Sequence, residues 1–122
     1  MQKQLLEELN QIAIELSKGN KVKGWCAYKR HGKPLSAFYN TRIGWVVKRP
    51  VLILDQRTPL AVRVPTICLN MNWVAQPIVQ KIDLKKAMII IKTKLLDFKG
   101  IHPDLHTGNV GWYKGNAVMF DW

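Results

Sequence analysis

The sequence predicts an α+β fold with an N-terminal helix, a small and mostly antiparallel sheet, and then a second helix and a β-hairpin. Residues 2–18 carry apolar side chains at the helical spacings of three and four. Residues 24–81 are short runs rich in β-branched and aromatic residues, broken by Gly and Pro, which is typical of strands. Residues 83–122 hold another helical pattern and two short apolar runs. The chain has 122 residues, so its three parts are expected to form a single domain. The part that contains the first helix is counted as residues 1–20.

The first helix is expected over residues 2–18. Lys18-Gly19-Asn20 supplies a basic last turn and a C-terminal stop. The apolar side chains that share one face of this helix, and therefore predict that it packs against something, are those of Leu5, Leu6, Leu9, Ile12, Ala13 and Leu16.

The middle of the chain predicts a series of short strands. Turns are expected at 31–34 and 55–59, where Gly and Pro stand between apolar runs. Connections this short favour antiparallel pairing. The candidate strands are residues 24–30, 34–40, 43–49, 51–55, 60–64, 66–71 and 74–81.

A second helix is expected from about residue 84 to residue 98, with Asp83 as its N-cap and Gly100 after its end. The loop 101–109 follows it. Two apolar runs, 109–113 and 117–121, are joined by Lys114-Gly115-Asn116, which resembles a hairpin connection.

The charge is the most unusual feature of the composition. Nineteen Lys and Arg residues against eight Asp and Glu leave a net charge of +11 and a pI near 10. Such a surface attracts polyanions, which include nucleic acids, nucleotide phosphates, anionic membranes and acidic proteins. Because the basic residues are scattered along the chain, a solvated basic surface explains them as well as a duplex-binding stripe does.

The cysteines and the apolar runs bear on the compartment. Cys26 and Cys68 are the two cysteines and form no C-x-x-C motif, so neither a disulfide framework nor a zinc signature is expected. Glu7, Glu8 and Glu15 interrupt any signal-peptide hydrophobic region. No apolar run approaches the roughly 20 residues that span a bilayer. A soluble protein of the reducing cytoplasm, with no membrane partner, is therefore expected.

The loop 101-IHPDLHTGN-109 carries the polar residues that are best suited to catalysis or metal binding. A carboxylate beside an amide, with Asp121 brought near by the hairpin, can hold a hard cation through oxygen ligands. Asp104 could then accept a proton from an attacking hydroxyl group. The simpler alternative is that Asp104 and Asn109 only form Asx turns within the loop.

Two histidines of this loop offer a rival interpretation. His102 and His106 are four residues apart, so on a helix both could bind zinc. Pro103 and Gly108 argue against a helix here. His106 is instead expected to be structural and to bond to a backbone carbonyl near the loop.

The pattern H-x-D-L-x-x-x-N, with Asp121 following Asn109 by 12 residues, resembles the catalytic loop and metal-binding Asp of the protein-kinase-like superfamily. The variant HPDLHTGNVG…FDW is more similar to aminoglycoside and choline phosphotransferases, and to early protein kinases of lytic phages, than to ordinary protein kinases. The resemblance implies a kinase-like fold in which 24–81 is the N-lobe sheet and hinge. Because Trp122 directly follows the metal-binding Asp, residues 83–122 are expected to form a truncated C-lobe.

The resemblance also implies roles for the polar residues near the loop. Asp104 would orient or deprotonate the acceptor hydroxyl, and Asn109 and Asp121 would hold Mg²⁺. Lys48 ends 43-IGWVVKR-49, which looks like the third strand of a kinase N-lobe, so it would bind the α- and β-phosphates of ATP.

Further nucleotide contacts are implied by position along the chain. Segment 32-GKPLSAFYN-40 occupies the place of the phosphate-covering turn, which makes Ser36, Ala37 and Phe38 candidate cofactor-binding residues. Gln76 lies in 71–81, where the hinge is expected.

The sequence departs from the kinase pattern in two places. The G-x-G-x-x-G glycines are missing from the phosphate-covering segment. Asp55 is the one acidic residue between Lys48 and the hinge, so the glutamate that normally pairs with the nucleotide lysine has no obvious counterpart. A glutamate of the first helix (Glu7, Glu8 or Glu15) is suggested in its place.

Two functions follow. The first is an active minimal phosphotransferase that uses ATP and Mg²⁺ to phosphorylate a hydroxyl on a protein, including itself, for which the phage resemblance implies a role in host takeover. The second is an inactive kinase-like binding module that inhibits an acidic host protein or binds nucleic acid through its basic surface.

Overall fold

The computed structural model describes residues 2–30, 32–49, 62–96 and 105–120. The chain divides into two compact units. The first comprises Met1–Pro50 and Thr66–Ile78, and the second comprises Val51–Pro65 and Val79–Trp122. The third passage of the chain between the units, at residues 78 and 79, falls inside the segment 71–81 where the sequence predicts a hinge.

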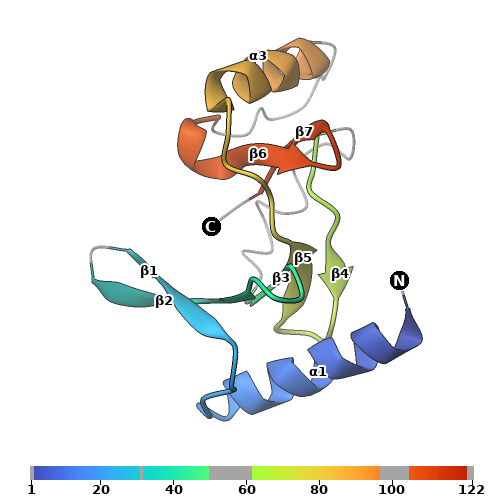
Figure 1. Cartoon of the computed structure of the whole chain (residues 1–122), viewed down its shortest axis with the longest axis vertical. Helices are drawn as coiled ribbons and strands as arrows, with labels where there is room; N and C mark the ends of the chain where they lie inside the picture. Colours follow the sequence, from blue (N-terminus) through green and yellow to red (C-terminus); the bar gives the residue numbers. More distant parts are fainter. Residues whose placement is uncertain (1, 31, 50–61, 97–104, 121–122) are drawn as a thin grey trace. The chain divides into compact units, whose positions relative to one another are not determined.

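The first unit contains the N-terminal helix and an antiparallel sheet (Figure 1). Within the described ranges, five strands pair in the order β1-β2-β3-β5-β4, and every pairing between neighbours is antiparallel. This confirms the predicted α+β class and the mostly antiparallel sheet. The strands are β1 (Cys26–Arg30), β2 (Lys33–Asn40), β3 (Trp45–Lys48), β4 (Ile67–Cys68) and β5 (Val74–Pro77).

The helix α1 (Lys3–Ser17) covers one face of this sheet. Its predicted apolar face is confirmed, because Leu9, Ala13 and Leu16 are buried against the side chains of Val47 and Ala75. The helix stops as expected at Gly19, whose φ of 79° suits a residue without a Cβ. Burial of these apolar side chains removes them from water and so stabilises the unit.

Two predicted strands of the first unit end well before the residue at which the sequence predicts their end. The strand predicted at 66–71 is confined to Ile67–Cys68, because Asn70 begins a turn in which its Oδ1 accepts a hydrogen bond from the N–H of Asn72 at 2.8 Å. The strand predicted at 74–81 ends at Pro77, after which the N–H of Ile78 donates to the carbonyl of Gly44 at 2.9 Å.

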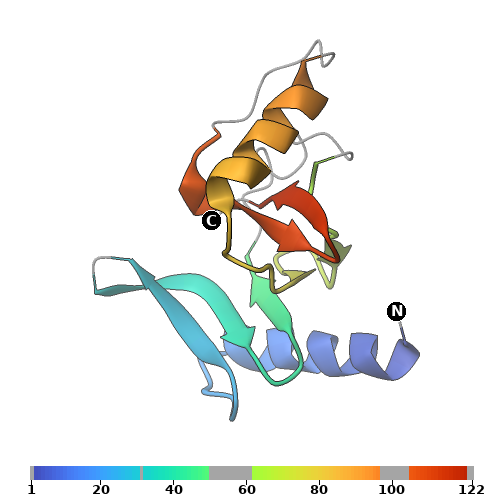
Figure 2. The same ribbon diagram turned by 45° about the horizontal axis from the view of Figure 1, so that its top comes forward.

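The second unit packs a helix on a β-hairpin (Figure 2). Helix α3 (Leu84–Leu95) buries Ala87, Ile91 and Leu95 against the hairpin residues Val110 and Met119. The hairpin consists of β6 (Val110–Tyr113) and β7 (Asn116–Met119). Its connection has two residues rather than the predicted three, because Asn116 already pairs with Tyr113.

The hairpin turn has the geometry that suits the twist of paired strands. Lys114 and Gly115 both have positive φ, 48° and 80°, as a type I′ turn requires. A short segment also joins the far side of the hairpin, because Arg63 forms a parallel bridge with Met119. The strand predicted at 60–64 is thus limited to this bridge within the described residues, and the one predicted at 51–55 lies outside them.

Asp83 takes the N-cap position of the second helix, as predicted, and its carbonyl accepts from the N–H of Ala87 at 3.1 Å, but its side chain does not cap the helix. Its φ of 42° and ψ of 49° are left-handed, and its side chain makes no capping hydrogen bond among the described residues. A capping side chain needs extended backbone at this position to reach the N–H groups of the first turn. The predicted helix end near residue 98 lies outside the described part of the chain.

Candidate functional site

Lys48 is the last residue of the third strand of the sheet, as the resemblance implies. It stands opposite Ala37 of β2 on one side and Val74 of β5 on the other. Its side chain is 2% exposed, so the central strand holds this lysine in the interior and not at a solvated strand end. An ammonium so deeply buried carries a high desolvation cost and is typical of a functional or tightly bonded lysine.

The pairing register divides the predicted nucleotide residues between the two faces of the sheet. Side chains alternate along a strand, and Val47 points to the face that α1 covers. Lys48, Ala37 and Gln76 therefore share the opposite face. Phe38 lies on the helix side, where it packs in the core with its ring 6.2 Å from that of Trp73.

Gln76 and Ser36 differ in their exposure to solvent. Gln76 is 2% exposed, and its Nε2 donates a hydrogen bond to Oγ1 of Thr66 at 3.0 Å. Ser36 is exposed, and its carbonyl accepts from the N–H of Arg49 at 3.0 Å. Of the five residues assigned to the nucleotide, the register thus brings three to one face, with Lys48 at the strand end.

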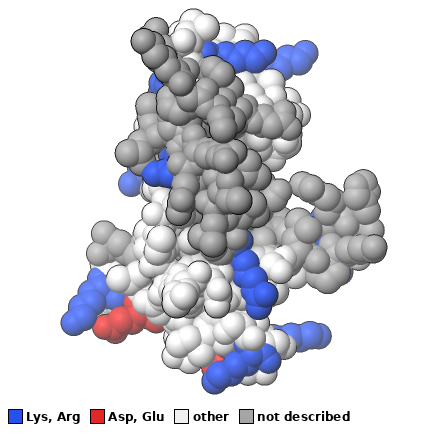
Figure 3. Space-filling view, turned by 180° about the vertical axis from the view of Figure 1, so that it is seen from behind, with Lys and Arg blue, Asp and Glu red and all other residues white. Residues whose placement is uncertain are grey.

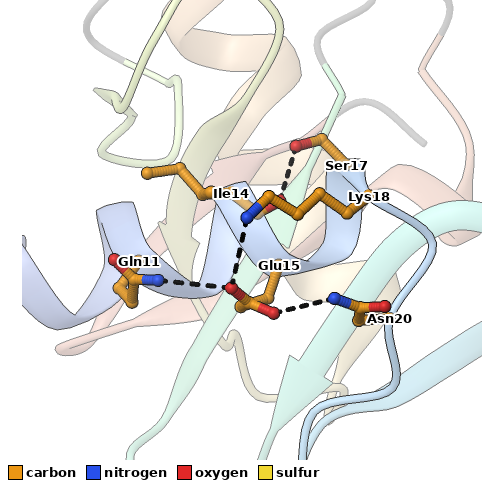
Figure 4. A network of polar contacts seen from close by, with 6 residues as sticks. All are labelled: Gln11, Ile14, Glu15, Ser17, Lys18 and Asn20. Atoms are coloured by element: carbon orange, nitrogen blue, oxygen red, sulfur yellow. Dashed lines mark hydrogen bonds and ion pairs between the residues drawn. The ribbon is translucent and has the colours of Figure 1, made fainter.

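The glutamates suggested as partners of Lys48 belong to α1, which packs on the sheet face opposite to that of Lys48. The Glu15 carboxylate bonds to side chains of its own helix region, with Nε2 of Gln11 at 3.4 Å, Nδ2 of Asn20 at 2.9 Å and Nζ of Lys18 at 3.8 Å (Figure 4). Glu7 and Glu8 are exposed, whereas Lys48 is buried. The suggestion therefore finds no support among the described residues.

In the second unit, a short 3-10 turn (Thr107–Asn109) leads from the predicted catalytic loop into β6. His106 and Asn109 lock this turn from its two ends. Nδ1 of His106 accepts a hydrogen bond from the N–H of Gly108 at 3.0 Å, and Oδ1 of Asn109 accepts one from the N–H of His106 at 3.1 Å. His106 is structural, as predicted, but the predicted bond to a carbonyl is wrong: its ring nitrogen accepts from an amide.

The hairpin returns the chain to this turn. The N–H of Phe120 donates to the carbonyl of Asn109 at 3.0 Å, so residues 11 positions apart in sequence become neighbours. Phe120 directly precedes Asp121 in the sequence. The hairpin therefore brings the chain back to Asn109 at Phe120, and the predicted approach of Asp121 itself stays a prediction. His102, Asp104 and Asp121 themselves lie outside the described residues, so neither the predicted base nor the histidine pair is placed.

Sequence reasoning missed Lys81, which contacts the 3-10 turn, the start of β6 and the residue that follows β7. Its Nζ donates to the carbonyls of Gly108 at 3.3 Å and Val110 at 3.1 Å, and it lies 4.2 Å from the centre of the Phe120 ring. Desolvation by burial lowers the pKa of this ammonium, so these contacts offset only part of its lost hydration. No sequence signal marks it, because a lysine in so basic a chain is inconspicuous and its partners are 27 and 29 residues away.

An amide oxygen such as Oδ1 of Asn109 is of the kind that a hard cation binds. In the structure this oxygen accepts the hydrogen bond from the N–H of His106. Among the described residues no three His, Cys, Asp or Glu side chains gather as a metal site, and Cys26 and Cys68 are free thiols. Within the same residues, no helix has the length and apolar character needed to cross a membrane.

Comparison of the chain with protein-family models, curated proteins and solved structures gives no significant match. The candidate site therefore rests on the residues and the geometry of the two units.

Proposed function

We propose that this chain is a minimal kinase-like phosphotransferase that uses ATP and Mg²⁺ to phosphorylate a hydroxyl group on a protein, including one of its own. Lys48 binds the α- and β-phosphates, Asn109 and Asp121 hold the metal, and Asp104 orients or deprotonates the acceptor hydroxyl. A role in host takeover by a phage is the biological setting that the resemblance to phage kinases suggests.

The observation that carries the proposal is the return of the β6–β7 hairpin to Asn109. A metal site made from Asn109 and Asp121 requires two positions 12 residues apart to become neighbours. The bond of 3.0 Å from the Phe120 N–H to the Asn109 carbonyl joins the residue before Asp121 to Asn109.

The first unit gives independent support. The nucleotide lysine of a kinase is expected on the third strand of the small sheet. Lys48 ends the third strand in chain order, on the sheet face opposite α1. Ala37 and Gln76 share that face, so the residues assigned to the nucleotide from the sequence include a set that could act on one ligand.

Thermal unfolding with ATP in the presence and absence of Mg²⁺ tests this proposal. A ligand that binds only the folded protein raises its stability by mass action, so ATP with Mg²⁺ should raise the melting temperature of the wild-type chain. Asp121→Asn should lose the metal-dependent part of this rise, and Lys48→Met should lose the rise itself. Lys23→Met, which removes an exposed lysine of the first unit, is the charge-matched control. A wild-type chain that gains no stability from millimolar ATP and Mg²⁺ would contradict the proposal.

An inactive binding module is the second candidate, and the charge of +11 favours it. Its partner would be an acidic protein or a nucleic acid. In Figure 3, the lysine and arginine side chains stand in separate places, and the acidic side chains drawn lie beside basic ones. Nucleic-acid binding would weaken steeply with salt, because each neutralised phosphate releases counterions. A gel shift with duplex and single-stranded DNA at about 150 mM salt therefore separates these partners.

A further inference from the structure

Helix α3 carries large apolar side chains on two sides, and the hairpin covers one of them (Figure 2). Ala87, Ile91 and Leu95 form the covered side. Ile89 and Leu96 lie elsewhere around the helix, and they are 65% and 79% exposed. The outer side of a surface helix is ordinarily polar, so a second apolar stripe on α3 is a candidate contact surface.

The two exposed side chains are aligned along the helix. A spacing of seven residues corresponds to almost two full turns, so Ile89 and Leu96 differ by only about 20° around the axis. Leu96 keeps the helical geometry, with φ of −55° and ψ of −37°. Along the axis the two residues stand about 10 Å apart. Both side chains can therefore contact one partner segment.

Exposed lysines flank this apolar stripe. Residues three and four apart are neighbours on a helix surface, so Lys85 and Lys86 both adjoin Ile89. Lys92 lies between Ile89 and Leu96 and adjoins both. The sequence of α3 contains no Asp or Glu, and within the described ranges none of these three lysines forms an ion pair. These five residues, called here the outer face of α3, present apolar contact area surrounded by positive charge.

We propose that the outer face of α3 is a docking surface for an acidic amphipathic helix of another protein. Such a helix would set apolar side chains seven residues apart against Ile89 and Leu96, with carboxylates beside the flanking lysines. The proposal gives a place to the acidic protein partner that the charge of +11 favours. It uses none of the residues assigned to phosphate transfer, so either assignment can fail without the other.

Three other occupants fit the outer face of α3 less well. A nucleic-acid backbone would engage the lysines but would gain little from Ile89 and Leu96. A helix that lies on a membrane needs a broad apolar face, whereas the broad apolar face of α3 is packed on the hairpin. A second copy of this chain would bring a further charge of +11. An acidic protein helix matches both the spacing and the charge.

Fluorescence anisotropy with a labelled helical peptide and the full chain tests the proposal. The peptide has about 20 residues, with Leu at every seventh position, Glu at the positions that flank each Leu, and Ala elsewhere. One comparison peptide replaces each Leu by Ser, and a second replaces each Glu by Gln. Duplex DNA and vesicles of phosphatidylserine and phosphatidylcholine are the remaining probes.

One pair of variants tests the apolar stripe. Ile89→Gln combined with Leu96→Gln removes the exposed apolar area and keeps a good helix former at both positions. Met71→Gln is the matched control, because Met71 is an apolar side chain of the first unit that is 90% exposed. Thermal unfolding checks that each variant is folded.

A second pair of variants tests the charge. Lys85→Gln combined with Lys92→Gln removes two positive charges from the outer face of α3. Lys21→Gln combined with Lys23→Gln removes two exposed lysines of the first unit and so changes the net charge equally.

Wild type should bind the peptide that carries both Leu and Glu more tightly than either comparison peptide, the DNA or the vesicles. The Ile89→Gln and Leu96→Gln variant should bind it about 10-fold more weakly, because central apolar contacts dominate such interfaces. The Lys85→Gln and Lys92→Gln variant should lose more affinity at about 50 mM salt than at about 500 mM, because salt screens the attraction. Both controls should bind like wild type.

Three results would overturn the proposal. They are no binding of the acidic peptide by wild type, equal binding by wild type and the Ile89→Gln and Leu96→Gln variant, and tighter binding of the DNA or the vesicles. No step of this experiment uses ATP, so none of these results bears on the proposed phosphotransfer.

Discussion

Gly111 of β6 provides a sharp test of how the segment before α3 lies on the hairpin. A Cβ at this position would stand 2.6 Å from Cγ2 of Val79 and 3.0 Å from the carbonyl oxygen of Gln80. Ordinary carbon contacts lie at about 3.5 to 4.0 Å, so Gly111→Ala forces the two segments apart by close to an ångström. The carbonyl that it meets is bonded to the N–H of Trp112 and cannot yield cheaply.

Overpacking of this kind costs about 1 to 3 kcal/mol in the free energy of unfolding. With a urea m-value of about 1 to 2 kcal/mol/M, a cost near the middle of that range lowers the unfolding midpoint by about 1 to 2 M.

A double-mutant cycle with Val79→Ala isolates the contact. Val79→Ala removes Cγ2, the atom nearest to the added methyl group. The double variant should therefore be less destabilised than the sum of the two single variants, by about 0.5 kcal/mol or more. Additive effects would show that Val79 and Gly111 are not in contact, and the account of this packing would be refuted.

Three further predictions concern stability. Leu9→Ala should lower the free energy of unfolding in urea by about 2 to 5 kcal/mol, because Leu9 is fully buried on the sheet side of α1. Ile14→Ala, on the exposed side of the same helix, should lower it far less. Gly115→Ala should cost about 1 to 2 kcal/mol, since its φ of 80° is strained for alanine although nothing lies within 4 Å of the added methyl group; an unchanged midpoint would argue against the type I′ turn. Burial, and then the neighbouring Tyr39, raise the pKa of Tyr28 above its ordinary value near 10, so the stability that neutral Tyr28 contributes is full below pH 10 and is lost as the pH rises through the folded pKa. Wild type should thus lose more stability than Tyr28→Phe between pH 9 and about 11, and equal losses would contradict the shift.

The helices and the sheet were predictable because their patterns report burial directly. Leu9, Ala13 and Leu16 recur at helical spacing because one face of α1 contacts the sheet. The strand ends were less predictable, because they depend on local side-chain and backbone bonds that compete with strand pairing. Asn70 bonds to the backbone two residues on and ends β4 early, and Pro77 has no N–H with which to extend β5.

The candidate site was predictable only where its chemistry is local in sequence. The H-x-D-L-x-x-x-N spacing points to Asn109 and to the loop, and Lys48 follows from its strand. Asp83 takes the predicted N-cap position, but its left-handed backbone leaves its side chain without a capping bond. The His106 ring accepts from an amide and not from the predicted carbonyl partner, because its bond depends on how the turn folds. Lys81 was missed because its contacts are with residues 27 and 29 positions away, which no periodicity or motif encodes.

The most direct test of the central claim is phosphate transfer by wild type and by Asp104→Asn, measured with γ-labelled ATP, Mg²⁺ and the protein itself or a mixed protein acceptor. Asn is as good a turn former as Asp but cannot act as a base, so the substitution separates a structural role from a catalytic one. We expect wild type to transfer phosphate and Asp104→Asn to transfer it about 10²-fold to 10⁴-fold more slowly, with folding and ATP affinity nearly unchanged. Equal transfer by the two proteins, or no transfer by wild type under conditions in which it binds ATP, would contradict the assignment of this chain as a phosphotransferase.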